Sequence, residues 1–169
     1  MKLEGKTALV TGVAGAIGGA IAKFLSEDGM RLILVDVDEV GLQKAASEIK
    51  GDTYVLALDI SDYEAVKSGC DKAFAEFGPA DVLVNVAGIL SNNKLLQTSP
   101  EEWKRIHEVN LDGPFYLSQM VVSHMKEQSW GRIVNICSYA GKSGGMTSGT
   151  AYSSSKAGIY SPGRSSSCS

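Results

Sequence analysis

Short apolar runs rich in Val, Ile and Leu alternate along this 169-residue chain with segments of helical periodicity. The runs lack a strict alternation of polar and apolar residues, which is expected for strands buried on both faces of a parallel sheet. The repeated strand–helix order implies right-handed crossovers between parallel strands. We therefore predict an α/β fold built on a doubly wound parallel sheet.

The boundaries of the elements follow from the same pattern. Strands are expected at residues 7–11, 31–36, 54–58, 81–85 and 132–137, and helices at about residues 16–28, 39–49, 62–77 and 100–127. Two of the helices open with a capping-box pattern, SDYE at residues 61–64 and SPEE at residues 99–102. In the second pattern proline takes the first helical position, where its missing N–H costs no hydrogen bond.

The last nine residues differ in composition from the rest of the chain. Five of the nine residues at 161–169 are serine, and Pro162-Gly163 would end any preceding helix. We divide the chain into one domain, residues 1–160, and an atypical Ser-rich tail, residues 161–169. A shifted reading frame, an alternative ending or a misassigned stretch would each explain such a tail.

Composition argues against several classes of partner. The net charge is −3 and no dense basic patch occurs, which argues against nucleic acid. The first residues lack the character of a secretory signal, and no apolar stretch reaches membrane-spanning length. Cys70, Cys137 and Cys168 have no metal-binding spacing and are typical of reduced thiols. We expect a cytoplasmic protein that binds neither a membrane nor a metal.

A glycine-rich turn, TGVAGAIG at residues 11–18, follows the first predicted strand and opens the first predicted helix. Such a turn exposes backbone amides at a helix N-terminus, which suits the pyrophosphate of a dinucleotide. Gly12 permits the sharp turn, and Gly18 lets the helix pack close to the sheet. A plain tight turn would have the same glycines, but the position between strand and helix favours a dinucleotide site.

Asp36 ends the second predicted strand, 24 residues after Gly12. A carboxylate there can accept hydrogen bonds from both ribose hydroxyls of the adenosine half, and it would repel a 2′-phosphate. The glycine turn carries no Lys or Arg, so NAD is favoured over NADP. Asp36 could also cap the next helix. Asp59 and Ile60 follow the third strand, where the carboxylate could meet the adenine amino group or serve as a turn residue.

Tyr152 and Lys156 stand four residues apart, which places both side chains on one face of a helix. An ammonium beside a phenol stabilises the phenolate, so Tyr152 could donate or accept a proton near neutral pH. Such a pair alone is often a surface pair. Ser138, fourteen residues before Tyr152, and the nucleotide turn favour a proton-handling site instead.

Pro114 lies four residues after Asn110 in the longest predicted helix. Because proline has no N–H, it cannot bond the carbonyl of Asn110, and a local kink is expected. We hypothesise that the freed carbonyl holds a water that relays protons to Lys156. Unchanged pH–rate behaviour in a Pro114→Ala variant would contradict this hypothesis.

These motifs together resemble the short-chain dehydrogenase/reductase family, especially its members of the 3-oxoacyl-carrier-protein reductase type, over about residues 5–159. The turn at residues 11–18 is similar to the family's Thr-Gly-x-x-x-Gly-x-Gly motif. Residues 85–88 (NVAG) are similar to its Asn-Asn-Ala-Gly motif. The resemblance implies a Rossmann-like fold and hydride exchange between a nicotinamide and an alcohol or carbonyl carbon.

Four positions match the family's catalytic residues. Asn110 corresponds to its helix asparagine, and Ser138 to the serine after its fifth strand. Tyr152 and Lys156 correspond to its Tyr-x-x-x-Lys motif. The resemblance implies that Tyr152 exchanges a proton with the substrate oxygen, that Lys156 also binds the nicotinamide ribose, and that Ser138 polarises the substrate oxygen.

The cofactor contacts that the resemblance and the residues imply are distributed over the whole domain. They are Gly12, Gly15, Ile17, Gly18, Asp36, Asp59, Ile60, Asn85, Ala87, Gly88, Tyr152 and Lys156. Two positions depart from the family pattern: Ala16 replaces the second glycine of the turn, and Val86 replaces the second asparagine of the later motif. Family members also continue beyond the Tyr/Lys helix, so we expect a fold that lacks its last strands and helices.

Three interpretations remain open. The leading one is an NAD-dependent oxidoreductase acting on a small-molecule alcohol or carbonyl substrate, truncated or incompletely recorded. The second is a catalytically impaired nucleotide-binding remnant. The third is a chain that is competent only in a homo-oligomer, in which a partner copy covers the exposed edge of the sheet.

Overall fold

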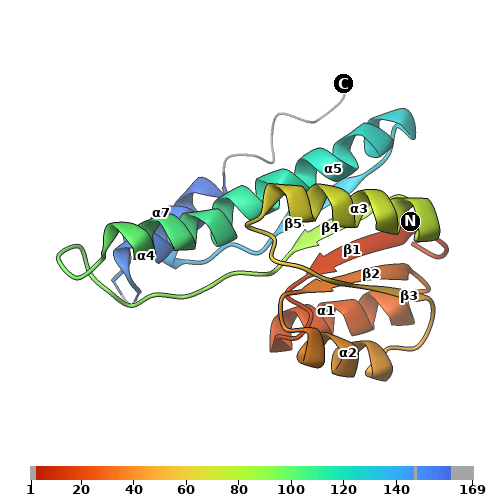
Figure 1. The fold of residues 1–169 in the computed structure, drawn as a ribbon, viewed down its shortest axis with the longest axis horizontal. Coiled ribbons are helices and arrows are strands. Elements are labelled where there is room, and N and C mark those ends of the chain that lie inside the picture. Colours follow the sequence, from red (N-terminus) through yellow and green to blue (C-terminus); the bar gives the residue numbers. More distant parts are fainter. Residues whose placement is uncertain (1–2, 147, 161–169) are drawn as a thin grey trace.

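A five-stranded parallel sheet forms the centre of the computed structural model, which describes residues 3–146 and 148–160. The strands lie in the order β3-β2-β1-β4-β5, and every neighbouring pair is parallel (Figure 1). Their bounds are β1 Thr7–Thr11, β2 Arg31–Asp36, β3 Thr53–Ala57, β4 Val82–Asn85 and β5 Arg132–Asn135. The predicted doubly wound sheet is confirmed, with the strand order reversing at β1.

Helices cover both faces of the sheet (Figure 1). α1 (Ala16–Glu27) and α2 (Glu39–Glu48) pack on one face, and α3 (Tyr63–Phe77) and α5 (Gly113–Glu127) pack on the other. Alternate strand residues enter two separate cores: Leu9 belongs to the α3/α5 core and Val10 to the α1/α2 core. Because both faces are covered, the inner strands read as unbroken apolar runs.

The helix starts agree in part with the predicted capping patterns. Ser99 caps α4 (Pro100–His107) as expected, its hydroxyl accepting a hydrogen bond from the Glu102 amide at 3.1 Å. The cap of α3, however, is Asp62, whose carboxylate accepts from the amides of Glu64 and Ala65 at 3.0 and 3.1 Å. A carboxylate is as good an N-cap as a hydroxyl, and the Ser61 side chain is bound elsewhere.

The long helix predicted at residues 100–127 is interrupted. A π-helical segment, Glu108–Asp112, separates α4 from α5, and Asn110 lies buried at its centre. Pro114 sits in the first turn of α5. The irregularity expected at Asn110 is therefore confirmed in position, and it takes the form of a wider helical turn of the kind often found at functional sites.

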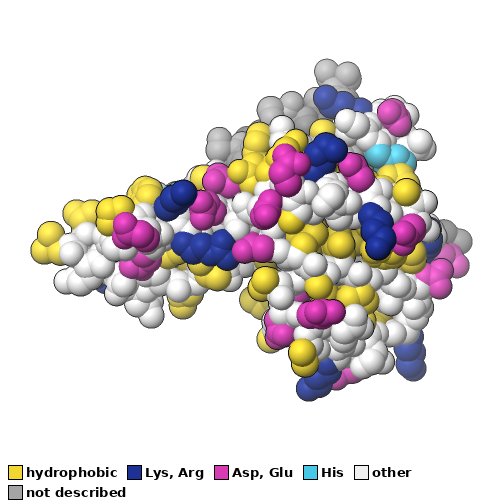
Figure 2. Space-filling model, viewed as in Figure 1, with side chains coloured by type: hydrophobic (Ala, Val, Ile, Leu, Met, Phe, Trp, Pro, Cys, Tyr) yellow, Lys and Arg dark blue, Asp and Glu magenta, His cyan; other side chains and the backbone are white. Residues whose placement is uncertain are grey.

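The chain after β4 leaves the sheet and forms an arm (Figure 1). The arm is residues 86–99, and next to it lie α4, α6 (Ala140–Ser143) and α7 (Thr150–Gly158), with α7 packed on α4 and on α6. Hydrophobic side chains gather at its end (Figure 2), where Leu95 and Leu96 are 75% and 93% exposed. No helix in the described ranges is long and apolar enough to cross a membrane. The Ser-rich tail lies outside the described residues.

Candidate active site

Two glycines of the turn after β1 are required by backbone contacts. Gly12 adopts a φ of +71°, and a Cβ at this position would lie 2.9 Å from the amide nitrogen of Ala87. A Cβ on Gly18 would overlap the carbonyl oxygen of Gly12. Only glycine avoids both contacts. The turn therefore holds the N-terminus of α1 tightly against the ends of β1 and β4.

Thr11, the last residue of β1, ties this turn to the loop after β4. Its fully buried hydroxyl oxygen accepts hydrogen bonds from the amides of Val86 and Ala87, each at 3.0 Å. The loop backbone is thus fixed even though Val86 replaces the family's second asparagine. Sequence reasoning did not assign this role to Thr11, although a buried polar residue ending an apolar strand is a signal for it.

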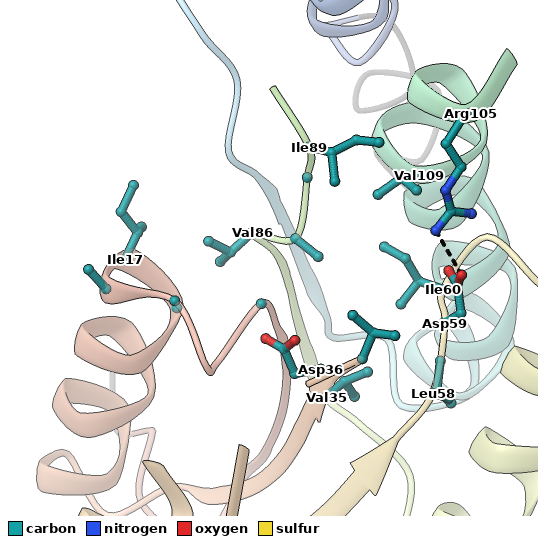
Figure 3. Close-up of a pocket in the computed structure, with 17 residues that line it drawn as sticks. Ile17, Val35, Asp36, Leu58, Asp59, Ile60, Val86, Ile89, Arg105 and Val109 are labelled. Carbon is teal, nitrogen blue, oxygen red and sulfur yellow. Dashed lines mark hydrogen bonds and ion pairs between the residues drawn. The ribbon is translucent and has the colours of Figure 1, made fainter. Parts of the chain in front are cut away.

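The Asp36 carboxylate is held by two backbone amides. One oxygen, Oδ2, accepts from the Ala14 amide at 2.9 Å, and the other, Oδ1, accepts from the Asp38 amide at 3.0 Å. The cap of α2 is Asp38, whose carboxylate accepts from the Gly41 amide. Asp36 therefore does not cap the helix but joins β2 to the glycine turn, with its carboxylate directed into the space beside that turn (Figure 3).

A cavity of about 450 Å³ opens at the carboxyl ends of the strands, where the strand order reverses. This is the position at which open α/β sheets bind ligands. Nine of the twelve predicted cofactor residues line it: Gly12, Gly15, Ile17, Gly18, Asp36, Asp59, Ile60, Ala87 and Gly88. Other lining residues were not predicted, among them Val35, Leu58, Ile89, Arg105 and Val109. We call this cavity the cofactor groove.

Asp59 forms one wall of the cofactor groove (Figure 3). Its Oδ1 accepts from the amide and the hydroxyl of Ser61 at 2.9 and 2.7 Å, and its Oδ2 accepts from Nη2 of Arg105 at 2.9 Å. Burial acts to raise the pKa of Asp59, but the hydrogen bonds from Ser61 and Arg105 outweigh it and hold that pKa below its ordinary value. Asp59 is thus a bonded turn residue that also faces the groove.

Asn110 joins α7 to the arm. Its Oδ1 accepts from the Ile89 amide at 2.8 Å, and its Nδ2 donates to the Ile89 carbonyl and to Oγ of Ser155, each at 3.0 Å. Asn110 is fully buried. The side chain therefore fixes α7, which carries Ser155, against the segment that leads away from the cofactor groove.

Lys156 lies directly behind the wall of the cofactor groove. A Cβ on Gly88, which lines the groove, would be 3.5 Å from Nζ of Lys156. The ammonium donates to the Ile136 carbonyl at 2.9 Å. Burial lowers the pKa of Lys156 from its ordinary value, and the neighbouring Cys137 opposes part of this effect. The groove and the predicted proton-handling helix therefore meet at one glycine.

Ser138 and Tyr152 lie on neighbouring segments but are not bonded to each other. The Ser138 hydroxyl accepts from the Ala140 amide at 3.2 Å, and Tyr152 is half-buried on α7. The hydrogen bonds of the described residues include none between the hydroxyls of Ser138 and Tyr152, or between Tyr152 and Lys156. The structure thus brings the segments that carry these residues side by side, and a catalytic role for the residues stays a prediction.

Asn85 does not line the cofactor groove. Its Nδ2 donates to Oδ1 of Asn135 on the adjacent strand at 2.8 Å. Its own Oδ1 is buried and has no hydrogen-bond partner among the described residues. A buried oxygen without a hydrogen bond costs free energy. This atom, which precedes the loop that lines the groove, is therefore available to accept a hydrogen bond.

The sheet order, and the position of the groove where that order reverses, define a doubly wound, Rossmann-like α/β fold. Residues 6–165 match the family model described as short chain dehydrogenase. The chain belongs to this family, whose named relatives are oxidoreductases, and the resemblance noted in the sequence is confirmed.

Individual relatives support the same assignment. The chain is 38% identical over 159 residues to the 3-oxoacyl-(acyl-carrier-protein) reductase FabG of Vibrio cholerae. It is 39% identical to FabG of Escherichia coli. It is 36% identical over 161 residues to a D-threitol dehydrogenase of Mycolicibacterium smegmatis, covering 94% of this chain and 62% of that enzyme. For both FabG proteins the matched region covers 94% of this chain and 65% of the relative.

A solved crystal structure, that of gox2181, has the same fold. It superposes with a TM-score of 0.88 at 33% sequence identity, covering 94% of this chain and 64% of the other. The chain thus spans about 65% of the length of the curated relatives it matches.

Proposed function

We propose that the chain is an NAD-dependent oxidoreductase that transfers a hydride between a nicotinamide and the carbon of a small alcohol or carbonyl substrate. The observation that carries the proposal is the contact between the cofactor groove and Lys156 at Gly88. An ammonium at this contact could bind the nicotinamide ribose and also lower the pKa of the Tyr152 phenol through its positive charge.

The groove fits a dinucleotide. Gly12, Gly15 and Gly18 line the groove beside the N-terminus of α1, a place that suits a pyrophosphate. The two backbone amides of Ala14 and Asp38 hold the Asp36 carboxylate with one bond to each oxygen, so further lone pairs remain for ribose hydroxyls. Of the described residues that line the groove, Arg105 is the one cation, and it is paired with Asp59. These features support NAD over NADP.

When bound, the nicotinamide gives or accepts the hydride. Tyr152 exchanges the accompanying proton with the substrate oxygen, and the Lys156 ammonium favours the phenolate by its charge. Ser138 holds and polarises the substrate oxygen through its hydroxyl. Asn110 keeps α7 in register with the groove through its bonds to Ile89 and Ser155. A water held by the Asn110 carbonyl remains the proposed route for protons to Lys156.

A direct test is to titrate the purified chain with NAD and with NADP, and to assay turnover on a panel of alcohols and ketones. We expect NAD to bind more tightly and to support turnover. Turnover with NADP but not with NAD would contradict the assignment of Asp36. The second candidate, a nucleotide-binding remnant, is favoured by the absence of Ser138, Tyr152 and Lys156 from the groove lining. NAD binding without turnover on any substrate would select it.

We also propose that the protein acts as a homo-oligomer in the cytoplasm. Supporting this, the edge strand β5 leaves Val134 45% exposed, although the residue belongs to the central sheet. An apolar edge of this kind is a site for association. Light scattering at several protein concentrations would test it, and a monomer at all concentrations would contradict it.

A further inference from the structure

The arm reaches the loop that precedes α7 through one lysine. The ammonium nitrogen of Lys94 donates to the carbonyl oxygens of Gly145 and Ser148, each at 2.7 Å, and to that of Met146 at 3.3 Å. A lysine ammonium has three N–H donors, and here each has an acceptor. Three carbonyl dipoles therefore converge on one positive charge.

The backbone of the same arm binds the start of α7. The amide of Gly149, the N-cap, donates to the Ser91 carbonyl at 2.7 Å, and the amide of Thr150 donates to the Asn93 carbonyl at 2.9 Å. These are amides that a helix cannot satisfy internally. A Cβ on Gly149 would lie 2.6 Å from the Ser91 oxygen, so the two backbones are in direct contact.

The arm is in turn anchored to α4 by Glu102. One carboxylate oxygen accepts from the Ser91 hydroxyl, and the other accepts from Nδ2 of Asn93 at 2.8 Å. Hydrogen bonds from Asn93 and Ser91 hold the pKa of Glu102 below its ordinary value. A continuous set of bonds therefore runs from α4 through the arm to the first turn of α7, which carries Tyr152.

We propose that Lys94 is a positioning residue, whose ammonium serves as an internal cation that fixes the loop before α7 and with it the placement of Tyr152. Without the charge, three carbonyl groups would point at one another and the loop would rearrange to reach water. Tyr152 lies two residues beyond Thr150, within the turn that the arm holds. The effect on turnover rests on the proposed function, whereas the effect on the loop does not.

The kinetic test compares Lys94→Met with Lys104→Met. Lys104 is an exposed lysine of α4 whose nearest partner is Glu108 at 3.6 Å, so its replacement is the matched control. A displacement of about 1 Å in a reacting group costs roughly 10²-fold in rate. We expect kcat of Lys94→Met to fall by up to that factor while KM for NAD stays within about twofold, since Lys94 does not line the cofactor groove. Equal kcat in the two variants, or a parallel loss of NAD binding, would contradict the proposal.

Chemical rescue separates a missing cation from general damage. Ammonium chloride should restore part of the kcat of Lys94→Ala, whereas tetramethylammonium chloride at equal ionic strength should not, because it has no N–H to donate. Restoration by both salts, or by neither, would overturn the assignment of an internal cation. Lys94→Gln retains two N–H donors without the charge, so its kcat should lie between that of Lys94→Met and that of the unchanged chain. This variant replaces Lys94→Met in the test if Lys94→Met does not fold.

A second measurement does not depend on activity. Hydrogen exchange at the amides of Gly149 and Thr150 should quicken in Lys94→Met and remain unchanged in Lys104→Met. If the unchanged chain shows no turnover, the proposed function fails, but this exchange still decides the role of Lys94. Unaltered exchange at both amides would refute that role even in an active enzyme.

Discussion

The cofactor groove and the proposed proton-handling end of the site, at Ser138, Tyr152 and Lys156, are built in different ways. The groove is anchored by backbone contacts of the glycine turn at the ends of buried strands, where Val10, Leu34 and Val84 are 5% exposed or less. The other end depends on side chains that bridge separate segments, such as Lys94 and Asn110, and it adjoins the half-exposed strand β5. Backbone contacts in a core are hard to displace, whereas a bridging side chain can be removed by one substitution. We therefore expect the loss of one side chain to reduce turnover more than it weakens nucleotide binding.

The strongest separation of the two ends is expected from Tyr152→Phe. Loss of a positioned general acid or base costs roughly 10²–10⁴-fold in rate, and the phenyl ring preserves the packing of the half-buried side chain. Turnover measured under saturating NAD should fall by that factor, while the dissociation constant for NAD, measured by calorimetry, should change little. A variant with near-normal turnover would remove Tyr152 from the mechanism.

The next largest effect concerns the groove itself. In Gly18→Ala the new methyl group overlaps the Gly12 carbonyl oxygen, and overpacking of this kind costs about 1–3 kcal/mol. We expect a lower melting temperature and loss of measurable NAD binding. Gly19→Ala is a milder control: its Cβ would lie 3.1 Å from the Val13 oxygen, and a small shift of that oxygen would relieve the contact. Equal NAD affinity in the two variants would show that the backbone of the turn can move enough to accommodate the methyl group.

The glycine turn illustrates what could be predicted from the sequence and what could not. Gly12, Gly18 and Asp36 belong to one local strand–turn–helix unit, and their roles in the turn follow from chain geometry alone. The hydrogen bonds of Thr11 and Arg105 join residues that are 44 or more positions apart. No periodicity encodes such pairs, because they depend on where a side chain points after folding.

Asn110 also has contacts that the sequence could not predict. Its spacing from Pro114 predicted a free backbone carbonyl and a local irregularity, and the helix is irregular at that point. The structure adds three side-chain hydrogen bonds, to Ile89 and Ser155. Spacing within one helix cannot reveal them, since both partners lie on other segments.

A smaller effect is expected from Asp36→Ala. The Ala14 and Asp38 amides lose their acceptor, and a hydrogen bond to a charged group contributes about 1.5–3 kcal/mol. NAD binding should weaken by about tenfold or more, and the preference for NAD over NADP should narrow because the negative charge is gone. Isothermal titration with both nucleotides measures this. An unchanged preference would mean that Asp36 serves only to hold the glycine turn.

The smallest effect is expected at the outer wall of the groove. The folded-state pKa of Asp59 is lowered, so its bonds to Ser61 and Arg105 stabilise the protein fully above the unfolded value of about 4 and lose effect as the pH falls through the folded value. Because the side chains of Asp59 and Arg105 are 37% and 49% exposed, the contribution should be below about 1 kcal/mol. Asp59→Asn should thus melt slightly lower than the unchanged chain at pH 7, and the difference should shrink steadily as the pH falls below about 4. A difference in melting temperature that does not shrink would exclude a charge effect.

The contact between Gly18 and the Gly12 carbonyl has a consequence for genetic variation. Every single-base missense change in a glycine codon introduces a residue with a Cβ, and every such Cβ would enter the space that the carbonyl oxygen occupies. No substitution at the first or second base of this codon preserves glycine, whereas every substitution at the third base does. A library of random point variants selected for nucleotide binding should therefore retain only synonymous changes at position 18.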